Sequence, residues 1–170
     1  HIGYCLRNNC KDGNEIWKML GREKMVSLRK ATEDDLAHVS KLSELWVSEN
    51  ITYGLVPDSV PCLRNYIGEY FWVAEADSEI VGYIFGTVRE SDGLSVIGKG
   101  ETYLEIESVY VRPEYRNRNI GHQLVDRLIR TAEQNGIARA LVLSASKQWQ
   151  KIVGFYEKHG FNMWYVQMYR

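Results

Sequence analysis

The 170-residue sequence has little of what marks several classes of protein. It has 3 prolines and 3 cysteines, and the cysteines lack the paired spacing of zinc ligands, so neither a Pro-rich disordered chain nor a zinc module is expected. No apolar run approaches the roughly 20 residues that cross a bilayer. Because 21 Lys and Arg balance 22 Asp and Glu, a broad electrostatic grip on nucleic acid or anionic membrane is excluded. These absences favour a cytoplasmic globular domain.

The pattern of apolar residues changes at Met25 and divides the chain into two parts. Residues 1–24 begin with His1 rather than Met and offer few apolar side chains, so we interpret them as an N-terminal extension or the remnant of a tag. Residues 25–170 carry regular apolar patterns and are expected to form the functional domain.

Apolar periodicity within residues 25–170 predicts an alternation of strands and helices. Strands are expected at 26–29, 71–76, 80–88, 103–111, 137–143 and 161–169. Helices are expected to begin at Thr32 and Ile120, with shorter ones over 62–70 and 147–158. The order predicts an α+β sandwich with helices on both faces of one sheet.

The most informative segment is the turn from the strand ending at Val111 into the helix starting at Ile120. Free backbone amides and the positive end of the helix dipole make such a turn suitable for a phosphate or pyrophosphate. Gly121 allows close approach, and Asn119 tolerates the positive φ of an anion-binding nest. Three arginines add charge that suits phosphates: Arg112, Arg116 and Arg118. A solvated turn without a ligand is the alternative that the residues leave open.

Two motifs together resemble the GNAT superfamily of N-acyltransferases. Arg116-x-x-Asn119-x-Gly121 is similar to the family's acetyl-coenzyme A loop, Gln/Arg-x-x-Gly-x-Gly/Ala, with Asn119 in place of the first Gly. The segment 154–161, Gly-Phe-Tyr-Glu-Lys-His-Gly-Phe, is similar to the family's C-terminal Phe-Tyr-x-x-x-Gly-Phe. The resemblance covers residues 25–170 and implies the acyl-CoA N-acyltransferase fold, with a mixed central sheet of about six or seven strands. The family often has a cofactor-contacting Asn where this chain has Gln148-Trp149-Gln150.

The resemblance implies direct transfer of an acetyl group from acetyl-CoA to an amine in a ternary complex, without a metal. Tyr156 resembles the family's general acid, and Glu107 resembles the strand carboxylate that some members use as a base. Alternation places Glu105, Glu107 and Val109 on one face of the strand unless a bulge intervenes. Glu107 could instead anchor the ammonium group of the acceptor.

The expected cofactor contacts follow from the same resemblance. The strand end bonds the pantetheine arm, and the loop amides hold the pyrophosphate. The implied cofactor-binding residues are Val109, Tyr110, Val111, Arg116, Asn117, Arg118, Asn119, Ile120, Gly121, His122 and Tyr156. His122 is expected near phosphates rather than as a base, and Cys62 is disfavoured as an acyl-carrying nucleophile because no His neighbours it in the sequence.

The acceptor is less defined. Aromatic and acidic side chains gather in the first two helices, at Trp46, Glu49, Tyr53, Tyr66, Glu69 and Tyr70. They could hold a cation, which predicts a small amine of the polyamine, amino sugar or amino-acid type, or they could simply pack the helices together. Alternatives are a catalytically weak acyl-CoA-binding regulatory module and acetylation of a protein or peptide amine. The apolar segment 161–169 predicts burial in the sheet or a homodimer contact.

Overall fold

The computed structural model describes residues 25–170, so the interpretation of residues 1–24 lies outside the described part of the chain. Within these described residues, one mixed sheet of five strands forms the centre, in the order β1-β2-β3-β4-β5. The strands are β1 (Val26–Lys30), β2 (Phe71–Ala76), β3 (Glu79–Glu90), β4 (Thr102–Val111) and β5 (Arg139–Val142). Neighbours are antiparallel except β4 and β5, which run parallel.

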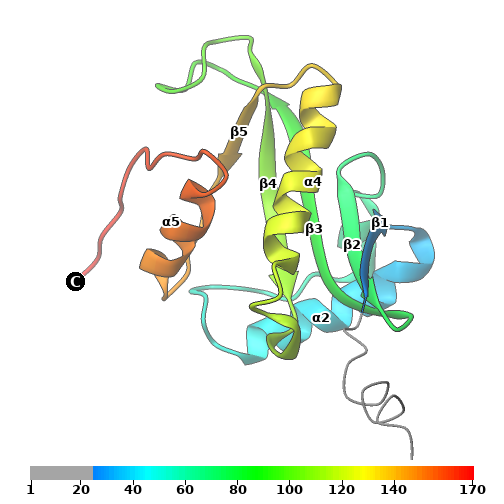
Figure 1. Ribbon diagram of the computed structural model, residues 1–170. Coiled ribbons are helices and arrows are strands. Elements are labelled where there is room, and N and C mark those ends of the chain that lie inside the picture. The colour runs from blue at the N-terminus through cyan, green and yellow to red at the C-terminus, as the bar shows by residue number, and fades with distance from the viewer. Residues whose placement is uncertain (1–24) are drawn as a thin grey trace, which may run out of the picture.

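Helices cover both faces of this sheet (Figure 1), as the sequence predicts. The 3₁₀ turn η1 (Glu33–Asp35), α2 (Leu36–Ser48) and α3 (Val60–Arg64) lie on one face. The second 3₁₀ turn, η2 (Pro113–Tyr115), leads to α4 (Ile120–Gln134), which packs with α5 (Trp149–Glu157) against the other face. Each face therefore has its own apolar core, and the sheet separates the two.

Turn chemistry explains several element boundaries. Asp77 and Ser78 both adopt positive φ, at 51° and 65°, which gives the tight hairpin between β2 and β3. Gly136, with φ of 79°, ends α4 where the sequence predicts the stop. Both features were readable from the sequence because they depend on local backbone preferences.

The predicted sixth strand, at 161–169, is wrong: residues 161–170 form no strand, and the described sheet ends at β5. The segment runs beside α5 and away from the sheet in Figure 1. Phe161 packs against the core, whereas most of the apolar side chains after it are exposed, including Met163, Trp164, Tyr165, Val166 and Met168. An apolar pattern becomes a strand only where a neighbouring backbone pairs with it. The homodimer inferred from this segment stays a prediction.

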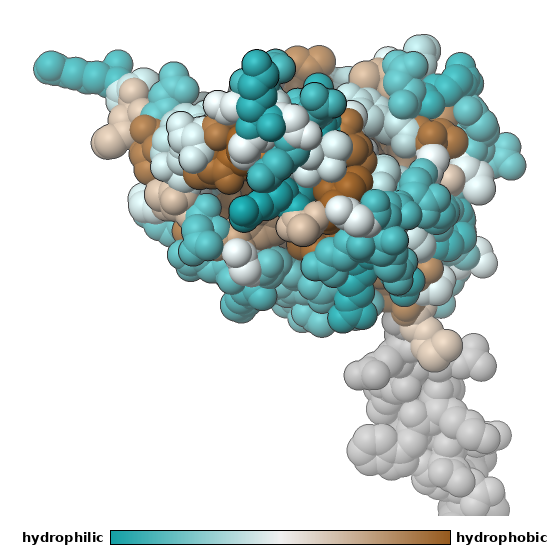
Figure 2. All heavy atoms as spheres, turned by 90° about the horizontal axis from the view of Figure 1, so that it is seen from above, coloured by the Kyte–Doolittle hydropathy of each residue, from teal (hydrophilic) through white to brown (hydrophobic). Residues whose placement is uncertain are grey.

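Hydrophilic residues cover most of the face seen in Figure 2, and hydrophobic residues show between them in separate patches. Within residues 25–170, no helix has both the length and the apolar character needed to cross a membrane.

Asp35 fastens β1 to the start of the helical face. Its carboxylate accepts two hydrogen bonds from Arg29, at 2.7 and 2.8 Å, and one from the Thr32 amide at 2.8 Å. The Arg29 bonds, opposed in part by burial, lower the pKa of Asp35 to about 2. Since the folded-state pKa lies below the unfolded value of about 4, this stabilisation is present above pH 4 and is lost as the pH falls toward 2.

We therefore expect Asp35→Asn to lower the free energy of unfolding by about 1–2 kcal/mol at pH 7. This value is smaller than the full pKa shift implies, because Arg29 is partly exposed and solvent screens the ion pair. Urea unfolding from pH 7 to pH 2 should show the difference from the wild type closing below pH 4. Asp34→Asn, on the exposed neighbour, is the matched control and should change little. A pH-independent difference would assign the loss to packing instead of charge.

Candidate active site

The site is organised by the divergence of β4 from β5. The two strands pair only from Tyr103 opposite Arg139 to Ile106 opposite Val142. β4 then continues to Val111 with β3 as its sheet partner, so its backbone on the β5 side has no strand partner among residues 25–170. The sequence-predicted strand end, Val109–Val111, lies in this open stretch.

A β-bulge at Glu107 sets the direction of the side chains along β4. Phe85 pairs with Ser108 and Gly86 with Ile106, which leaves Glu107 as the extra residue. The bulge that could interrupt the alternation is therefore present, and Glu107 and Val109 do not share a face. Val109 packs in the core beneath α4, whereas the Glu107 carboxylate turns to Arg89 of β3, with a 2.9 Å contact between Oε1 and Nη2.

Arg89 binds two carboxylates, those of Glu105 and Glu107. One guanidinium and two carboxylates leave this cluster with a formal charge of −1. Tyr66 lies near this cluster. Burial, and then the negative charge of Glu107, raise the pKa of the Tyr66 phenol. Arg89 could not be identified from the sequence because no motif marks it. Its pairing with Glu105 and Glu107 depends on the register of β3 against β4.

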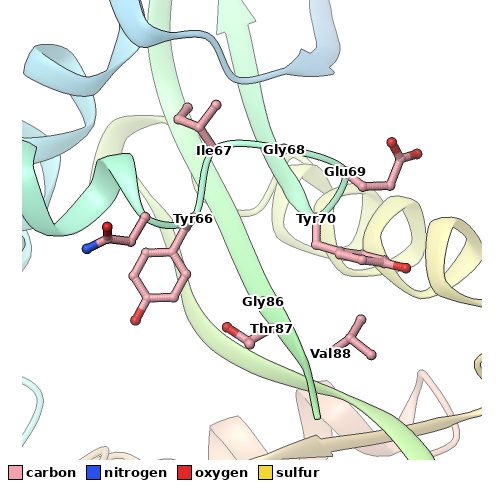
Figure 3. A pocket seen from close by; sticks show the side chains of 9 residues that line it. Tyr66, Ile67, Gly68, Glu69, Tyr70, Gly86, Thr87 and Val88 are labelled. Carbon is pink, nitrogen blue, oxygen red and sulfur yellow. The ribbon is translucent and has the colours of Figure 1, made fainter.

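A cavity of about 200 Å³ is lined by residues 65–70 and by Gly86, Thr87 and Val88 of β3. Figure 3 shows it between the segment 66–70 and β3, with the rings of Tyr66 and Tyr70 on its wall. Thr87, which lines the cavity, pairs with Glu105 across the sheet. The cavity therefore borders the face of β4 that carries the acidic cluster.

The turn into α4 has the geometry of an anion site. Asn117 and Asn119 both adopt φ of 62°, so Asn119 takes the left-handed conformation expected of the glycine it replaces. The first hydrogen bond of α4 runs from the Gln123 amide to the Asn119 carbonyl at 3.0 Å. The preceding amides of the first turn therefore have no acceptor within the helix. The Arg116 amide, in contrast, already donates to the Pro113 carbonyl at 3.2 Å.

The side chain of Arg116 does not point its charge into solution. Its guanidinium donates twice to Glu49, which caps the C-terminal end of α2, with both bonds at 2.7 Å, and its Nε donates to the Val111 carbonyl at 2.9 Å. The Tyr110 hydroxyl donates to the same carboxylate at 2.6 Å. Burial opposes ionisation of Glu49, but these donors outweigh it and lower its pKa. We call this set the Glu49–Arg116 bridge.

The three arginines of the loop therefore differ. Arg112 pairs with Glu79 and Glu114, and Arg116 pairs with Glu49. Arg118 lies over the ring of Tyr115 instead, with 5.3 Å from its guanidinium carbon to the ring centroid. All three were expected to add charge that suits phosphates, but carboxylates balance two of them: Glu114 is close to Arg112 in the sequence, whereas Glu79 and Glu49 are brought in by the fold.

Tyr156 is buried beneath α4 in the core that α5 completes. Its ring makes edge contacts with Phe155 and Phe161, at 5.1 and 5.3 Å between centroids. Burial raises the pKa of its phenol well above the ordinary value, so the hydroxyl stays protonated near neutral pH. A buried, protonated phenol can donate a proton or hydrogen bond, and it is a poor base.

The aromatic and acidic residues expected around an acceptor do not converge. Trp46 stacks on Tyr110 at 5.5 Å, and Glu49 belongs to the Glu49–Arg116 bridge. Glu69 pairs with Lys30 at 2.6 Å, toward the β1 edge of the sheet. Of the six, Tyr66 and Tyr70 line the 200 Å³ cavity together with Glu69. Cys62 is an exposed thiol, and no cluster among residues 25–170 could hold a metal ion.

Several acetyltransferases are similar to this chain in sequence or in fold. An N-alpha-acetyltransferase of Saccharolobus solfataricus is 28% identical over 142 residues, which cover 79% of each chain. One from Sulfurisphaera tokodaii is 27% identical over 81% of each chain. A predicted acetyltransferase from Clostridium acetobutylicum, solved with acetyl-CoA, superposes with a TM-score of 0.66 at 19% identity, covering 85% of this chain and 96% of that one. Residues 39–161 match the Acetyltransferase (GNAT) family. The chain therefore belongs to that family and is an acetyl-CoA-dependent N-acetyltransferase.

Proposed function

We propose that the chain acetylates the α-amine of a peptide or protein N-terminus, by direct transfer from acetyl-CoA. The observation that carries this acceptor is the activity of the two relatives, both N-alpha-acetyltransferases, which match about four-fifths of the chain. The acidic cluster of Glu105, Glu107 and Arg89 supports it, because a net negative charge beside a cavity attracts an ammonium group.

Acetyl-CoA would lie along the open stretch of β4. The backbone of Val109–Val111 supplies donors and acceptors for the pantetheine amides, and the amides of Asn117–His122 supply donors for the pyrophosphate. Arg118 is the arginine of this loop best placed to add charge, since carboxylates engage Arg112 and Arg116. Arg116 would act through its side chain on the strand rather than through its own amide.

The reaction moves two protons. The acceptor ammonium must lose a proton before its nitrogen attacks the thioester carbonyl, and the departing thiolate is best protonated as the C–S bond breaks. We assign proton removal to Glu107, acting through water, and thiolate protonation to Tyr156. The buried phenol of Tyr156 supports the second assignment because it is protonated at neutral pH.

A small amine is the second candidate acceptor. The 200 Å³ cavity has room for a compact amine or for the first residue of a peptide, but not for a longer segment of chain. Both acceptors present the same ammonium group to the acidic cluster, so the cavity supports either.

Thiol release from acetyl-CoA across a panel of acceptors tests the function. The panel contains short peptides with varied first residues, the same peptides with blocked N-termini, polyamines, amino sugars and free amino acids. We expect turnover with free N-termini and none with blocked ones. Faster turnover of small amines than of peptides would identify a small amine as the acceptor instead. Tight acetyl-CoA binding without any turnover would favour a regulatory binding module.

Substitution of Glu107 separates a base from an anchor. We expect Glu107→Gln to lower kcat at least tenfold and to flatten its rise with pH, because the proton acceptor is gone. Glu105→Gln is the matched control, since Glu105 binds the same arginine but lies where β4 is still paired with β5. A raised acceptor KM with an unchanged pH profile of kcat would identify Glu107 as an anchor.

A further inference from the structure

Two histidines and an aspartate form a chain between α4 and the end of α5. His159 Nδ1 lies 2.8 Å from Asp126 Oδ1, and His159 Nε2 lies 2.8 Å from His122 Nδ1. The His159 side chain is 4% exposed, whereas that of Asp126 is 51% exposed. A buried imidazole therefore connects a surface carboxylate to the first turn of α4.

Hydrogen-bond chemistry fixes the protons along this chain. A carboxylate only accepts, so the Nδ1 of His159 carries a proton toward Asp126. In neutral His159 the Nε2 then holds a lone pair, and the Nδ1 of His122 must be the donor between the rings. Neutral His122 is thereby left with a lone pair on Nε2. That nitrogen becomes a donor only when the ring takes up a second proton.

The position of His122 places its imidazole near the first turn of α4, where an anion would bind. His122 is the third residue of α4, in the turn whose amides lack acceptors within the helix. Helical side chains lean toward the N-terminus of their helix, which brings the ring back toward that turn. Its ring packs against Phe155, with 4.5 Å between centroids. An acceptor-only ligand such as a phosphate repels a lone pair there and binds an N–H.

We propose that His122 is a proton-gated contact to the pyrophosphate of acetyl-CoA, and that Asp126 and His159 are the positioning residues that hold it in this tautomer. The inference rests on the proposed seat of the pyrophosphate at the start of α4. It requires acetyl-CoA to bind together with a proton at pH values between the pKa of His122 in the free protein and its higher pKa in the complex.

The sign of the pH dependence follows from the groups around the ring. Burial and then the charges of His159 and Lys158 lower the pKa of His122 in the free protein, while Asp126 opposes them. A bound pyrophosphate adds negative charge and raises it. A group whose pKa is higher in the complex favours binding below the free-state pKa, and the gain fades as the pH rises through the value in the complex. We expect acetyl-CoA to bind about tenfold more tightly at pH 5.5 than at pH 8.5.

Calorimetric titration with acetyl-CoA between pH 5.5 and 8.5, in buffers of different ionisation enthalpy, measures affinity and proton uptake together. Because a tenfold gain in affinity corresponds to a pKa shift of about one unit, the wild type should take up at most about half a proton, at a pH between the two pKa values of His122. His122→Gln should abolish that uptake, and His159→Gln should reduce it. His38→Gln, on the exposed face of α2, is the matched control and should behave as the wild type. Equal proton uptake by the wild type and His122→Gln would overturn the inference.

Two further arms identify the phosphate and the tautomer. Acetyl-dephospho-CoA, which lacks the 3′-phosphate, should retain the proton uptake; its loss would overturn the assignment to the pyrophosphate. Imidazole ¹⁵N spectra of the free wild type at pH 8.5 should show the proton of His122 on Nδ1, and a proton on Nε2 would overturn the chain as drawn. No acetyl-CoA binding by the wild type at any pH would overturn the proposed function as well, whereas pH-independent binding overturns only this inference.

Discussion

Tyr156→Phe should lower kcat about 100-fold while the dissociation constant of acetyl-CoA changes less than about threefold. The substitution removes one hydroxyl and keeps the ring, so the edge contacts with Phe155 and Phe161 survive. In the proposed binding mode the backbone of β4 and the first turn of α4 hold the cofactor, and the variant leaves both in place. The loss therefore falls on the step in which the thiolate departs.

Tyr103→Phe is the matched control, because Tyr103 is also 7% exposed but lies at the start of β4, where that strand is paired on both sides. Steady-state rates with saturating acceptor, together with direct titration of acetyl-CoA, distinguish the two variants. A Tyr156→Phe enzyme that turns over at the wild-type rate would remove this phenol from the acid role. A large loss of cofactor affinity would instead make Tyr156 a binding residue.

Gly86→Ala should destabilise the fold by about 3 kcal/mol or more. A Cβ atom at Gly86 would lie 2.6 Å from the Glu105 carbonyl oxygen and 3.0 Å from Leu104 Cδ1. The first neighbour is backbone, so β4 itself would have to move. The movement falls at the bulge that aims Glu107, and we expect activity to fall further than the loss of folded protein explains.

Gly154→Ala provides the comparison for that stability measurement. Gly154 lies inside α5, and a Cβ there meets no atom within 4 Å. Replacing a helical glycine with alanine should leave stability unchanged or raise it by up to about 1 kcal/mol. Urea unfolding of both variants checks the pair, and an equally stable Gly86→Ala protein would show that β3 and β4 can separate at the bulge without cost.

Local chemistry made most of the fold predictable. The strand at 71–76 and the stop of α4 at Gly136 follow from turn residues and apolar periodicity, which act over a few positions. The same reasoning wrongly predicted a strand at 161–169, because an apolar pattern does not show whether a partner strand is present. The bulge at Glu107 was likewise invisible, since it depends on how two strands register.

The candidate site divides in the same way. The loop from Arg116 to Gly121 and the buried Tyr156 could be found from motifs, because their residue types are tied to short spacings. The partners of the candidate site residues could not be found from motifs. Glu49 meets Arg116 across 67 positions, Arg89 meets Glu107 across 18, and His159 meets His122 across 37. Such pairs arise only when the chain folds back on itself.

The Glu49–Arg116 bridge has a consequence for the energetics of cofactor capture. It joins the end of α2, the end of β4 and the loop of residues 116–121 through one guanidinium. In the proposed binding mode this loop is already ordered, so binding acetyl-CoA need not freeze a mobile segment at the cost of its conformational entropy. A change at Glu49, at the end of α2, would release Arg116 and so alter the shape of the loop.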